Sequence, residues 1–363
     1  MRKLTSTRCF IFGSVICFFF FLSSPVISQN TPTLAKQGTV ERIKVHGKGL
    51  EGNLSGDSPD REVSIYLPPS YKTNPKQRYP VVYLLHGFTD NDAQWYGFQT
   101  HWINLPNVVN KALAAGQLKE MILVTPNAYT RFQGSFYSNS VTTGNWEDFV
   151  AKELVAYIDS HYRTIPQVAS RGIAGHSMGG YGAFRIGQKY PEIFSSVYLL
   201  SPCCLSPSEN ELKNLENLTR LENIQTQEEV NKADFLTRAT FATGAAWAPN
   251  PKKPPFYLDL PTAKGQVQPL ILAKRMANMP IANLDQNINN VKKLNAIGFD
   301  AGTKDTNIAA SIQVLDQQLN NYGIKHSFEI YEGDHINRIA ERIETKMLGF
   351  FSQNLSFESK KVK

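Results

Sequence analysis

A serine lies at the centre of the sequence Gly175-His176-Ser177-Met178-Gly179-Gly180. An apolar run that predicts a buried strand, residues 171–174, precedes it, and a stretch with helical spacing begins near residue 178. A serine on such a tight strand-to-helix turn exposes its hydroxyl, and glycines two positions before and after are needed because side chains there would clash. This context predicts that Ser177 is a nucleophile, and the alternative is a turn with a structural role only.

A serine hydroxyl is a weak nucleophile at neutral pH, so it needs a base, usually a histidine that an acid holds in place. The chain has seven histidines. Only His335 directly follows the last predicted strand, where a loop at the carboxyl edge of the sheet can bring it over the serine. We therefore predict that His335 is the base. The alternative is a polar residue that caps the final helix.

The loop after the penultimate predicted strand offers two aspartates as the acid. Asp300 still lies within that strand, whereas Asp305 follows a glycine turn from which its side chain can reach back to the imidazole. We favour Asp305, and Asp334 is a third candidate that is better placed to cap the last helix. The resulting order along the chain, serine then acid then histidine, is the order of the α/β-hydrolase fold.

Acyl transfer by a serine also needs backbone donors for the oxygen that becomes negative in the transition state. The start of the helix after Ser177 supplies the N–H of Met178, at the positive end of the helix dipole. A second donor is expected from the loop after the strand that ends at Leu85, where His86-Gly87 lets the chain turn its amides, so we assign the N–H of Phe88. Each donor would supply about 3 kcal/mol of transition-state stabilisation.

The elements that must position these residues alternate along the chain. Short apolar runs rich in β-branched residues are separated by longer amphipathic stretches, which is typical of a mostly parallel sheet with helices on both faces. We therefore predict the α/β class and, from the serine turn, the α/β-hydrolase fold. The predicted strands are residues 61–67, 79–85, 121–125, 171–174, 196–200, 296–300 and 327–331, and the predicted helices are residues 146–162, 178–189, 307–322 and 336–353.

One stretch breaks this alternation. Residues 205–290, which we name the 205–290 segment, contain charged helix-like sequence followed by a proline-rich aromatic part. We interpret it as an insertion in a single catalytic domain, residues 29–363, that lies over the strand ends as a lid; a peripheral surface excursion is the alternative. Aromatic residues in and around the domain either line the substrate pocket or pack the core: Trp95, Tyr137, Trp146 and Trp247.

The first 28 residues have the pattern of a signal peptide. Three basic residues precede an apolar run that contains Phe18-Phe19-Phe20-Phe21, and small residues before Gln29 suit cleavage. The run is short for a membrane-spanning helix. We therefore predict that residues 1–28 are removed and that the protein is secreted or resides in the periplasm or cell envelope; an uncleaved N-terminal anchor is the alternative.

Composition excludes several other functions. The formal net charge is +7, and three of the positive charges lie in the predicted signal peptide, so the remaining excess is small and indicates no nucleic-acid partner. Two adjacent cysteines, Cys203 and Cys204, remain after cleavage; we expect small buried residues at a strand end, because a bridge between neighbours requires a strained ring. No cluster of histidine, cysteine or carboxylate residues has metal-ligand spacing, so we predict neither a metal nor another cofactor.

These residues resemble those of the putative esterase family of α/β-hydrolases, which includes S-formylglutathione hydrolases (esterase D), feruloyl and acetyl-xylan esterase domains, and mycolyltransferases. The resemblance implies that the nucleophile, acid and base are Ser177, Asp305 and His335. It is weakest in the 205–290 segment, so it transfers no substrate preference. The matching stretches cover about residues 49–353 and include residues 50–54, 66–71, 79–87, 134–137, 175–180, 302–305 and 333–335.

The sequence therefore predicts an exported serine carboxylesterase that forms an acyl-enzyme from a small-molecule or polysaccharide-linked ester. Acyl transfer to a sugar or another alcohol is an alternative that differs only in the acceptor. A serine peptidase is a further alternative, although the chain has no large N-terminal propeller-like domain. A catalytically silent binding module is the alternative of another class, since a fold alone does not prove activity. The sequence predicts no oligomeric state.

Overall fold

The computed structural model describes residues 37–116, 118–207 and 215–358, all within one compact unit that spans residues 36–363. The predicted signal peptide lies outside the described residues. None of the helices in the described part is both long and apolar enough to cross a membrane.

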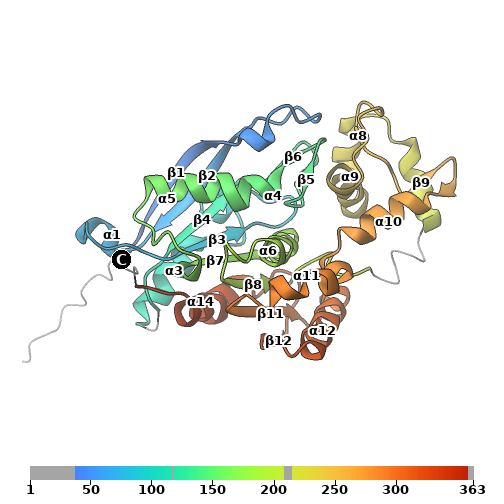
Figure 1. The fold of residues 1–363 in the computed structure, drawn as a ribbon. Coiled ribbons are helices and arrows are strands. Elements are labelled where there is room, and N and C mark those ends of the chain that lie inside the picture. Colours follow the sequence, from blue (N-terminus) through green and yellow to red (C-terminus); the bar gives the residue numbers. More distant parts are fainter. Residues whose placement is uncertain (1–36, 117, 208–214, 359–363) are drawn as a thin grey trace, which may run out of the picture. The chain divides into compact units, whose positions relative to one another are not determined.

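An eight-stranded sheet forms the centre of this unit (Figure 1). Its strands lie in the order β1-β2-β4-β3-β7-β8-β11-β12, and only β2 runs antiparallel to both of its neighbours. The six strands from β4 to β12 are therefore all parallel, so the loops that follow them meet at one edge of the sheet. The strands are β1 (Thr39–His46), β2 (Asp60–Leu67), β3 (Val81–Leu85), β4 (Ile122–Pro126), β7 (Arg171–His176), β8 (Ser196–Leu200), β11 (Ala296–Gly302) and β12 (Ser327–Tyr331).

Helices cover both faces of the sheet because each central strand is buried on both sides. On one face, Val81, Tyr83 and Leu85 join a core that contains α5 (Val155–His161), α6 (Met178–Lys189), α11 (Leu284–Val291) and α12 (Thr306–Asn321). On the other face, Val82 and Leu84 pack with α2 (Asp92–Trp95), α3 (Leu105–Ala114), α13 (Ile339–Arg342) and α14 (Leu348–Asn354). Alternate residues of one strand thus serve two separate cores.

All seven predicted strands exist, and their bounds differ from the prediction by at most two residues. The strand β1 was missed. It is an edge strand whose residues are mostly half-buried or exposed, so its sequence lacks the apolar run by which the others were recognised. The predicted helix 146–162 is α4 (Trp146–Asp148), a π-helical turn (Phe149–Leu154) and α5 in direct succession.

The 205–290 segment contributes no strand to the eight-stranded sheet among its described residues. It leaves the sheet after β8 and returns before β11, two strands that lie side by side. Its helices α8 (Gln227–Lys232), α9 (Phe235–Trp247) and α10 (Pro269–Ala277) lie together at the upper right of Figure 1, beside the tips of the small hairpin β5 (Asn139–Ser140) and β6 (Gly144–Asn145).

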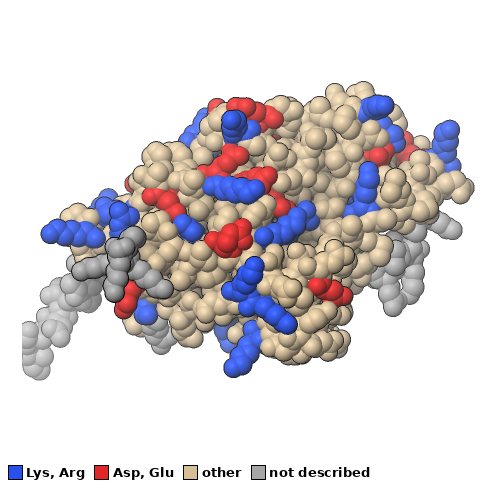
Figure 2. Space-filling model, viewed as in Figure 1, with Lys and Arg blue, Asp and Glu red and all other residues tan. Residues whose placement is uncertain are grey.

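Charged side chains of both signs are interspersed on the surface that faces the viewer in Figure 2. Blue and red groups alternate over the sheet's covering helices and over the 205–290 segment, and no stripe of one sign runs across this face. This distribution differs from the continuous basic surface with which proteins bind nucleic acid.

Candidate active site

The turn between β7 and α6 holds Ser177 in a backbone conformation that is rare for a residue with a side chain. Its φ angle is 55° and its ψ angle −115°. Two hydrogen bonds fix this conformation, because the Ser177 N–H donates to Leu200 O at 3.0 Å and its carbonyl accepts from the Tyr181 N–H at 3.0 Å. Such strain persists only where the surrounding structure over-determines it, and it is common at functional sites.

The glycines of the turn are required by close packing rather than by their φ angles. A Cβ atom at Gly175 would overlap the backbone of Gly179, and one at Gly179 would overlap the carbonyl of Leu85. The helix α6 thus begins directly against the ends of β3 and β7. This approach is what directs the Ser177 hydroxyl away from the sheet.

The structure brings Ser177, His335 and Asp305 together, although 158 residues separate the first two. His335 Nε2 lies 2.9 Å from Ser177 Oγ, and His335 Nδ1 lies 2.6 Å from Asp305 Oδ2. A carboxylate can only accept, so the Nδ1 atom carries the proton of the neutral ring and Nε2 is free to accept from the serine hydroxyl. The arrangement therefore has the geometry of a nucleophile, a base and an orienting acid.

Asp305 immediately precedes α12 and is anchored by its N–H, which donates to Gly302 O at 3.0 Å. The other two aspartates considered from the sequence are engaged elsewhere. Asp300 is fully buried, where it accepts from Tyr198 at 2.7 Å and pairs with Arg342 at 2.9 Å. Asp334 accepts from the N–H groups of residues 336 and 337 at 2.9 and 2.8 Å, so it caps the turn after His335.

His176, the residue before the serine, contacts His335. Its Nε2 atom lies 2.9 Å from the carbonyl oxygen of His335, and the two rings are 4.8 Å apart between centroids. Burial and the adjacent His335 ring lower the pKa of His176 to about 3. The neutral ring therefore donates from Nε2 and holds the backbone of His335 without adding a second positive charge to the site.

The loop after β3, residues 87–90, passes beside the nucleophile. A Cβ atom at Gly87 would lie 3.6 Å from Ser177 Cβ, so the residue before Phe88 lies next to the serine. Within the described residues the Phe88 N–H has no hydrogen-bond acceptor. The N–H of Met178, the first residue of α6, has no partner inside its own helix for geometric reasons. Within the described residues, neither predicted oxyanion donor is therefore used in another backbone hydrogen bond.

Asp90, at the end of this loop, is held by hydrogen bonds between its carboxylate and two neighbouring side chains. Its carboxylate accepts from Trp95 Nε1 at 3.0 Å and lies 3.3 Å from His101 Nε2. Burial by itself would raise the pKa of Asp90, but the hydrogen bonds from His101 and Trp95 outweigh it and lower the pKa. The carboxylate is therefore charged and keeps both partners at neutral pH.

The four aromatic residues considered from the sequence are all buried: Trp95, Tyr137, Trp146 and Trp247. Two other aromatic side chains, which sequence reasoning did not single out, are exposed beside the site. Trp102 is 38% exposed and packs edge-on against His176 at 5.7 Å, and Phe235 is 54% exposed and packs edge-on against Phe88 at 5.5 Å. No local motif marks them: Trp102 lies in a loop before α3, and Phe235 is the first residue of α9 in the 205–290 segment.

The two cysteines lie in the loop after β8, next to the nucleophile. The Cys203 N–H donates to the carbonyl of Ser177 at 3.2 Å. Both side chains are partly exposed, which corrects the expectation that they are buried, because they stand one turn beyond the end of the strand. The two side chains are not joined to each other in a disulfide.

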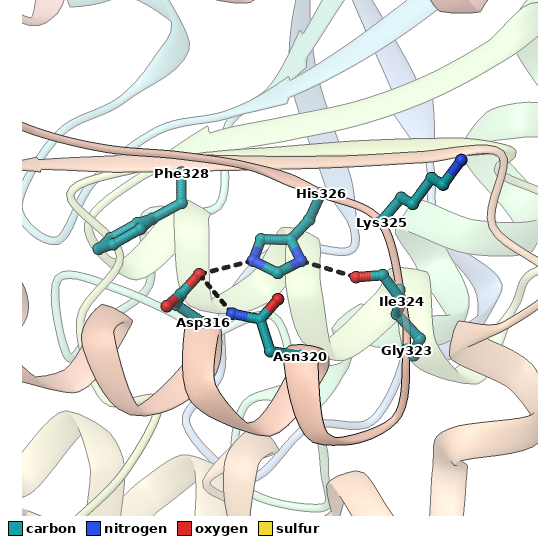
Figure 3. A pocket seen from close by; sticks show the side chains of 7 residues that line it. All are labelled: Asp316, Asn320, Gly323, Ile324, Lys325, His326 and Phe328. Atoms are coloured by element: carbon teal, nitrogen blue, oxygen red, sulfur yellow. Dashed lines mark hydrogen bonds and ion pairs between the residues drawn. The ribbon is translucent and has the colours of Figure 1, made fainter.

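A cavity of about 700 Å³ lies elsewhere, at the amino end of β12 (Figure 3). Figure 3 shows His326 between Asp316 of α12 and the carbonyl of Ile324, with both ring nitrogens engaged at 2.8 Å. Because Asp305 and His335 follow the carboxyl ends of β11 and β12, this cavity lies at the opposite edge of the sheet. Asn320 also donates to Asp316 at 3.2 Å. Because of its position, this cavity is separate from the site around Ser177.

The sheet order, the helices on both faces and the serine on the turn between β7 and α6 define the class of the protein. It has the α/β-hydrolase fold. A family model described as "Putative esterase" matches residues 58–338, which is more than half of the chain. The chain therefore belongs to the putative esterase family.

Curated relatives match part of the chain. An esterase of Mycobacterium tuberculosis is 34% identical over 140 residues, which are 37% of this chain and 27% of that protein. An endo-1,4-beta-xylanase/feruloyl esterase of Xylanibacter ruminicola is 30% identical over 149 residues, which are 40% of this chain and 20% of that protein. The matches thus span about a quarter or less of the length of these relatives.

Solved structures resemble nearly the whole described domain. A ferulic acid esterase has a TM-score of 0.59 and 22% identity, and the match covers 88% of this chain and 99% of that one. A fluorophosphonate-binding serine hydrolase of Staphylococcus aureus has a TM-score of 0.59 and 15% identity, with coverage of 87% and 99%. At these identities the likeness shows the fold.

The packing of the serine turn leads to a first prediction. Gly179→Ala places a methyl group into the Leu85 carbonyl, so α6 must move away from β3. We expect a loss of about 1–3 kcal/mol in the free energy of unfolding, measured in urea, and a large loss of ester hydrolysis.

Gly349→Ala in α14 is the matched control. Nothing lies within 4 Å of its added methyl group, so this variant is expected to keep its activity and to gain up to about 1 kcal/mol from helix propensity. Equal activity in the two variants would show that the approach of α6 to β3 does not set the position of Ser177.

Proposed function

We propose that the protein is a serine carboxylesterase that uses Ser177 as nucleophile, His335 as base and Asp305 as orienting acid. The observation that carries the proposal is the chain of two short contacts, Ser177 Oγ to His335 Nε2 at 2.9 Å and His335 Nδ1 to Asp305 Oδ2 at 2.6 Å. Membership of the putative esterase family supports it independently.

The reaction follows from these positions. His335 Nε2 takes the proton of Ser177 Oγ, and this oxygen attacks the carbonyl carbon of the ester. The N–H groups of Phe88 and Met178 donate to the resulting oxyanion. Collapse of the tetrahedral intermediate breaks the bond to the alcohol, which leaves with the proton from His335. Water, deprotonated by the same nitrogen, then attacks the acyl carbon. The bond from this carbon to Ser177 Oγ breaks, the carboxylic acid leaves, and His335 returns the proton to Ser177 Oγ.

The substrate is proposed to be a small-molecule or polysaccharide-linked carboxylic ester. The names of two similar proteins, a xylanase/feruloyl esterase and a ferulic acid esterase, support an ester of this kind. The partly exposed rings of Trp102 and Phe235 pack against His176 and Phe88, so they place apolar surface next to these two residues. Such a surface suits an ester with an apolar group next to the carbonyl.

Labelling with a fluorophosphonate probe tests the nucleophile directly. We expect the purified protein to be labelled and Ser177→Ala to be unlabelled, because only an activated serine reacts. The same pair of proteins is then assayed on p-nitrophenyl esters from acetate to palmitate and on methyl ferulate. A folded wild-type protein that neither reacts with the probe nor hydrolyses any ester would refute the enzyme and favour a binding module.

The role of the acid is tested by a pair of neighbouring aspartates. Asp305→Asn removes the charge that holds the His335 tautomer, so kcat is expected to fall roughly 10³–10⁴-fold with little change in KM. Asp334→Asn, in which the amide oxygen can still cap the turn at residues 336 and 337, is expected to retain most of kcat. Similar kcat values for the two variants would assign the acid elsewhere.

We further propose that the enzyme acts outside the cytoplasm. The proposal rests on the sequence of residues 1–28, with its basic start and apolar run. When the full chain is expressed with a secretion-competent host, we expect the mature N-terminus at Gln29 by mass spectrometry and the protein in the periplasm or medium. An intact N-terminus on a cytoplasmic protein would contradict export.

A further inference from the structure

Gln133 joins two parts of the molecule that are far apart in sequence. Its backbone has a φ angle of 67°, and its carbonyl accepts from the N–H of Thr89 at 3.0 Å. Thr89 follows the proposed oxyanion donor Phe88 and itself has a φ angle of 72°, which is unfavourable for a β-branched residue. The bond from Gln133 therefore helps to hold the loop after β3 in a conformation that its own sequence does not favour.

The side chain of Gln133 is held by the 205–290 segment. Its Oε1 atom accepts from Arg238 Nη1 of α9 at 2.8 Å, and its Nε2 atom donates to Asn231 Oδ1 of α8 at 3.3 Å. Gln133 itself is 7% exposed, whereas Arg238 is half-buried and Asn231 is exposed. Arg238 forms no ion pair within the described residues, which leaves Gln133 as its closest polar partner there.

The residue after Gln133 also packs against the two residues whose N–H groups are the proposed oxyanion donors. Gly134, the next residue, packs so closely that an added Cβ atom would lie 2.6 Å from Met178 Sδ and 2.7 Å from Phe88 Cδ2. Phe235 at the start of α9 also packs its ring against Phe88. Gly134 and α9 therefore both contact the side chain of Phe88.

We propose that the 205–290 segment positions the oxyanion hole, and that Gln133 is the positioning residue through which it acts. Arg238 and Asn231 fix the side chain of Gln133, and its backbone fixes Thr89 and hence the direction of the Phe88 N–H. The segment thus completes the site for the transition state in addition to bordering it. The inference rests on the proposed esterase function, because the oxyanion hole has a role only in acyl transfer.

The expected effects on kcat and KM follow from the step of the reaction in which the oxyanion is present. The oxygen becomes negative only in the transition state, so a displaced donor lowers kcat and leaves KM nearly unchanged. Removal of a whole donor costs about 10²–10³-fold in kcat. Because Gln133→Ala displaces a donor without removing it, we expect a decrease of roughly 10–100-fold with KM within about threefold.

A graded series separates positioning from simple destabilisation. Gln133→Glu keeps an oxygen acceptor for Arg238 and loses only the bond to Asn231, so it is expected to retain more activity than Gln133→Met, which keeps the size and loses both bonds. Gln167→Ala is the control, because this half-buried glutamine bonds to Ser170 and Glu358, away from the site. Thermal unfolding of every variant checks that the compared proteins are folded at the assay temperature.

The inhibition constant of a phenylboronic acid is a measurement that a merely structural defect would not change. Its tetrahedral adduct with Ser177 places an oxygen in the oxyanion hole, so the inhibition constant should rise in step with the loss of kcat across the Gln133 series. In a double-mutant cycle, Arg238→Ala should add little to Gln133→Ala, because both act through one contact.

Four outcomes decide the inference. A wild-type protein without probe labelling or turnover would overturn the proposed function, and the positioning role with it. An active wild type with kcat within threefold in Gln133→Ala would overturn the positioning role alone. An equal loss of kcat in the glutamate and methionine variants, with an unchanged inhibition constant for the boronic acid, would also overturn the positioning role. A loss of kcat that is smaller for glutamate than for methionine, with a parallel rise in the inhibition constant, would support it.

Discussion

The close approach of α6 to the ends of β3 and β7 is the constraint on which the rest of the site depends. Two glycines allow it, since a methyl group on either would overlap backbone atoms. The approach holds Ser177 at a φ angle of 55° and brings the start of α6, with its unpaired N–H groups, beside the serine. Asp305 and His335 follow the parallel strands β11 and β12. They therefore lie at the same edge of the sheet as Ser177, where the loops after all the parallel strands emerge.

Backbone strain gathers at this edge of the sheet. Of the nine described residues other than glycine with positive φ, seven lie in the loops that surround the serine: Thr89, Gln133, Phe136, Tyr137, Ser177, Ser201 and Cys204. Each such conformation costs free energy, which packing and hydrogen bonds elsewhere must offset. Backbone hydrogen bonds supply part of this, because the Thr89 N–H donates to the carbonyl of Gln133 and the Ser177 N–H donates to Leu200 O. The buried His176 holds the backbone of His335 in the same way, so several polar groups around the site serve to fix the backbone.

The 205–290 segment shows how an enzyme of this fold can be adapted. It leaves and re-enters the sheet between two neighbouring strands, so it can vary without disturbing the eight-stranded core. Its contacts through Asn231, Phe235 and Arg238 nevertheless reach the loop after β3. A surface segment can therefore contribute to the chemistry through the backbone of its neighbours, without supplying a reacting group.

The sequence by itself determined the fold class, seven strands, the helix after the serine, and Ser177, His335 and Asp305 as a candidate set, because local patterns encode them: buried apolar runs, glycine spacing, and side chains just after strand ends. It did not reveal β1, whose half-exposed residues lack an apolar run. It also did not reveal Gln133, Trp102 or Phe235. The role of Gln133 arises from contacts with residues about 100 positions away in the chain, which leave no periodic signal in the sequence. Trp102 and Phe235 matter because they are exposed beside the site, and no sequence pattern indicates that exposure. Only the tertiary structure could decide them, since it alone brings the 205–290 segment against the loop that carries Phe88.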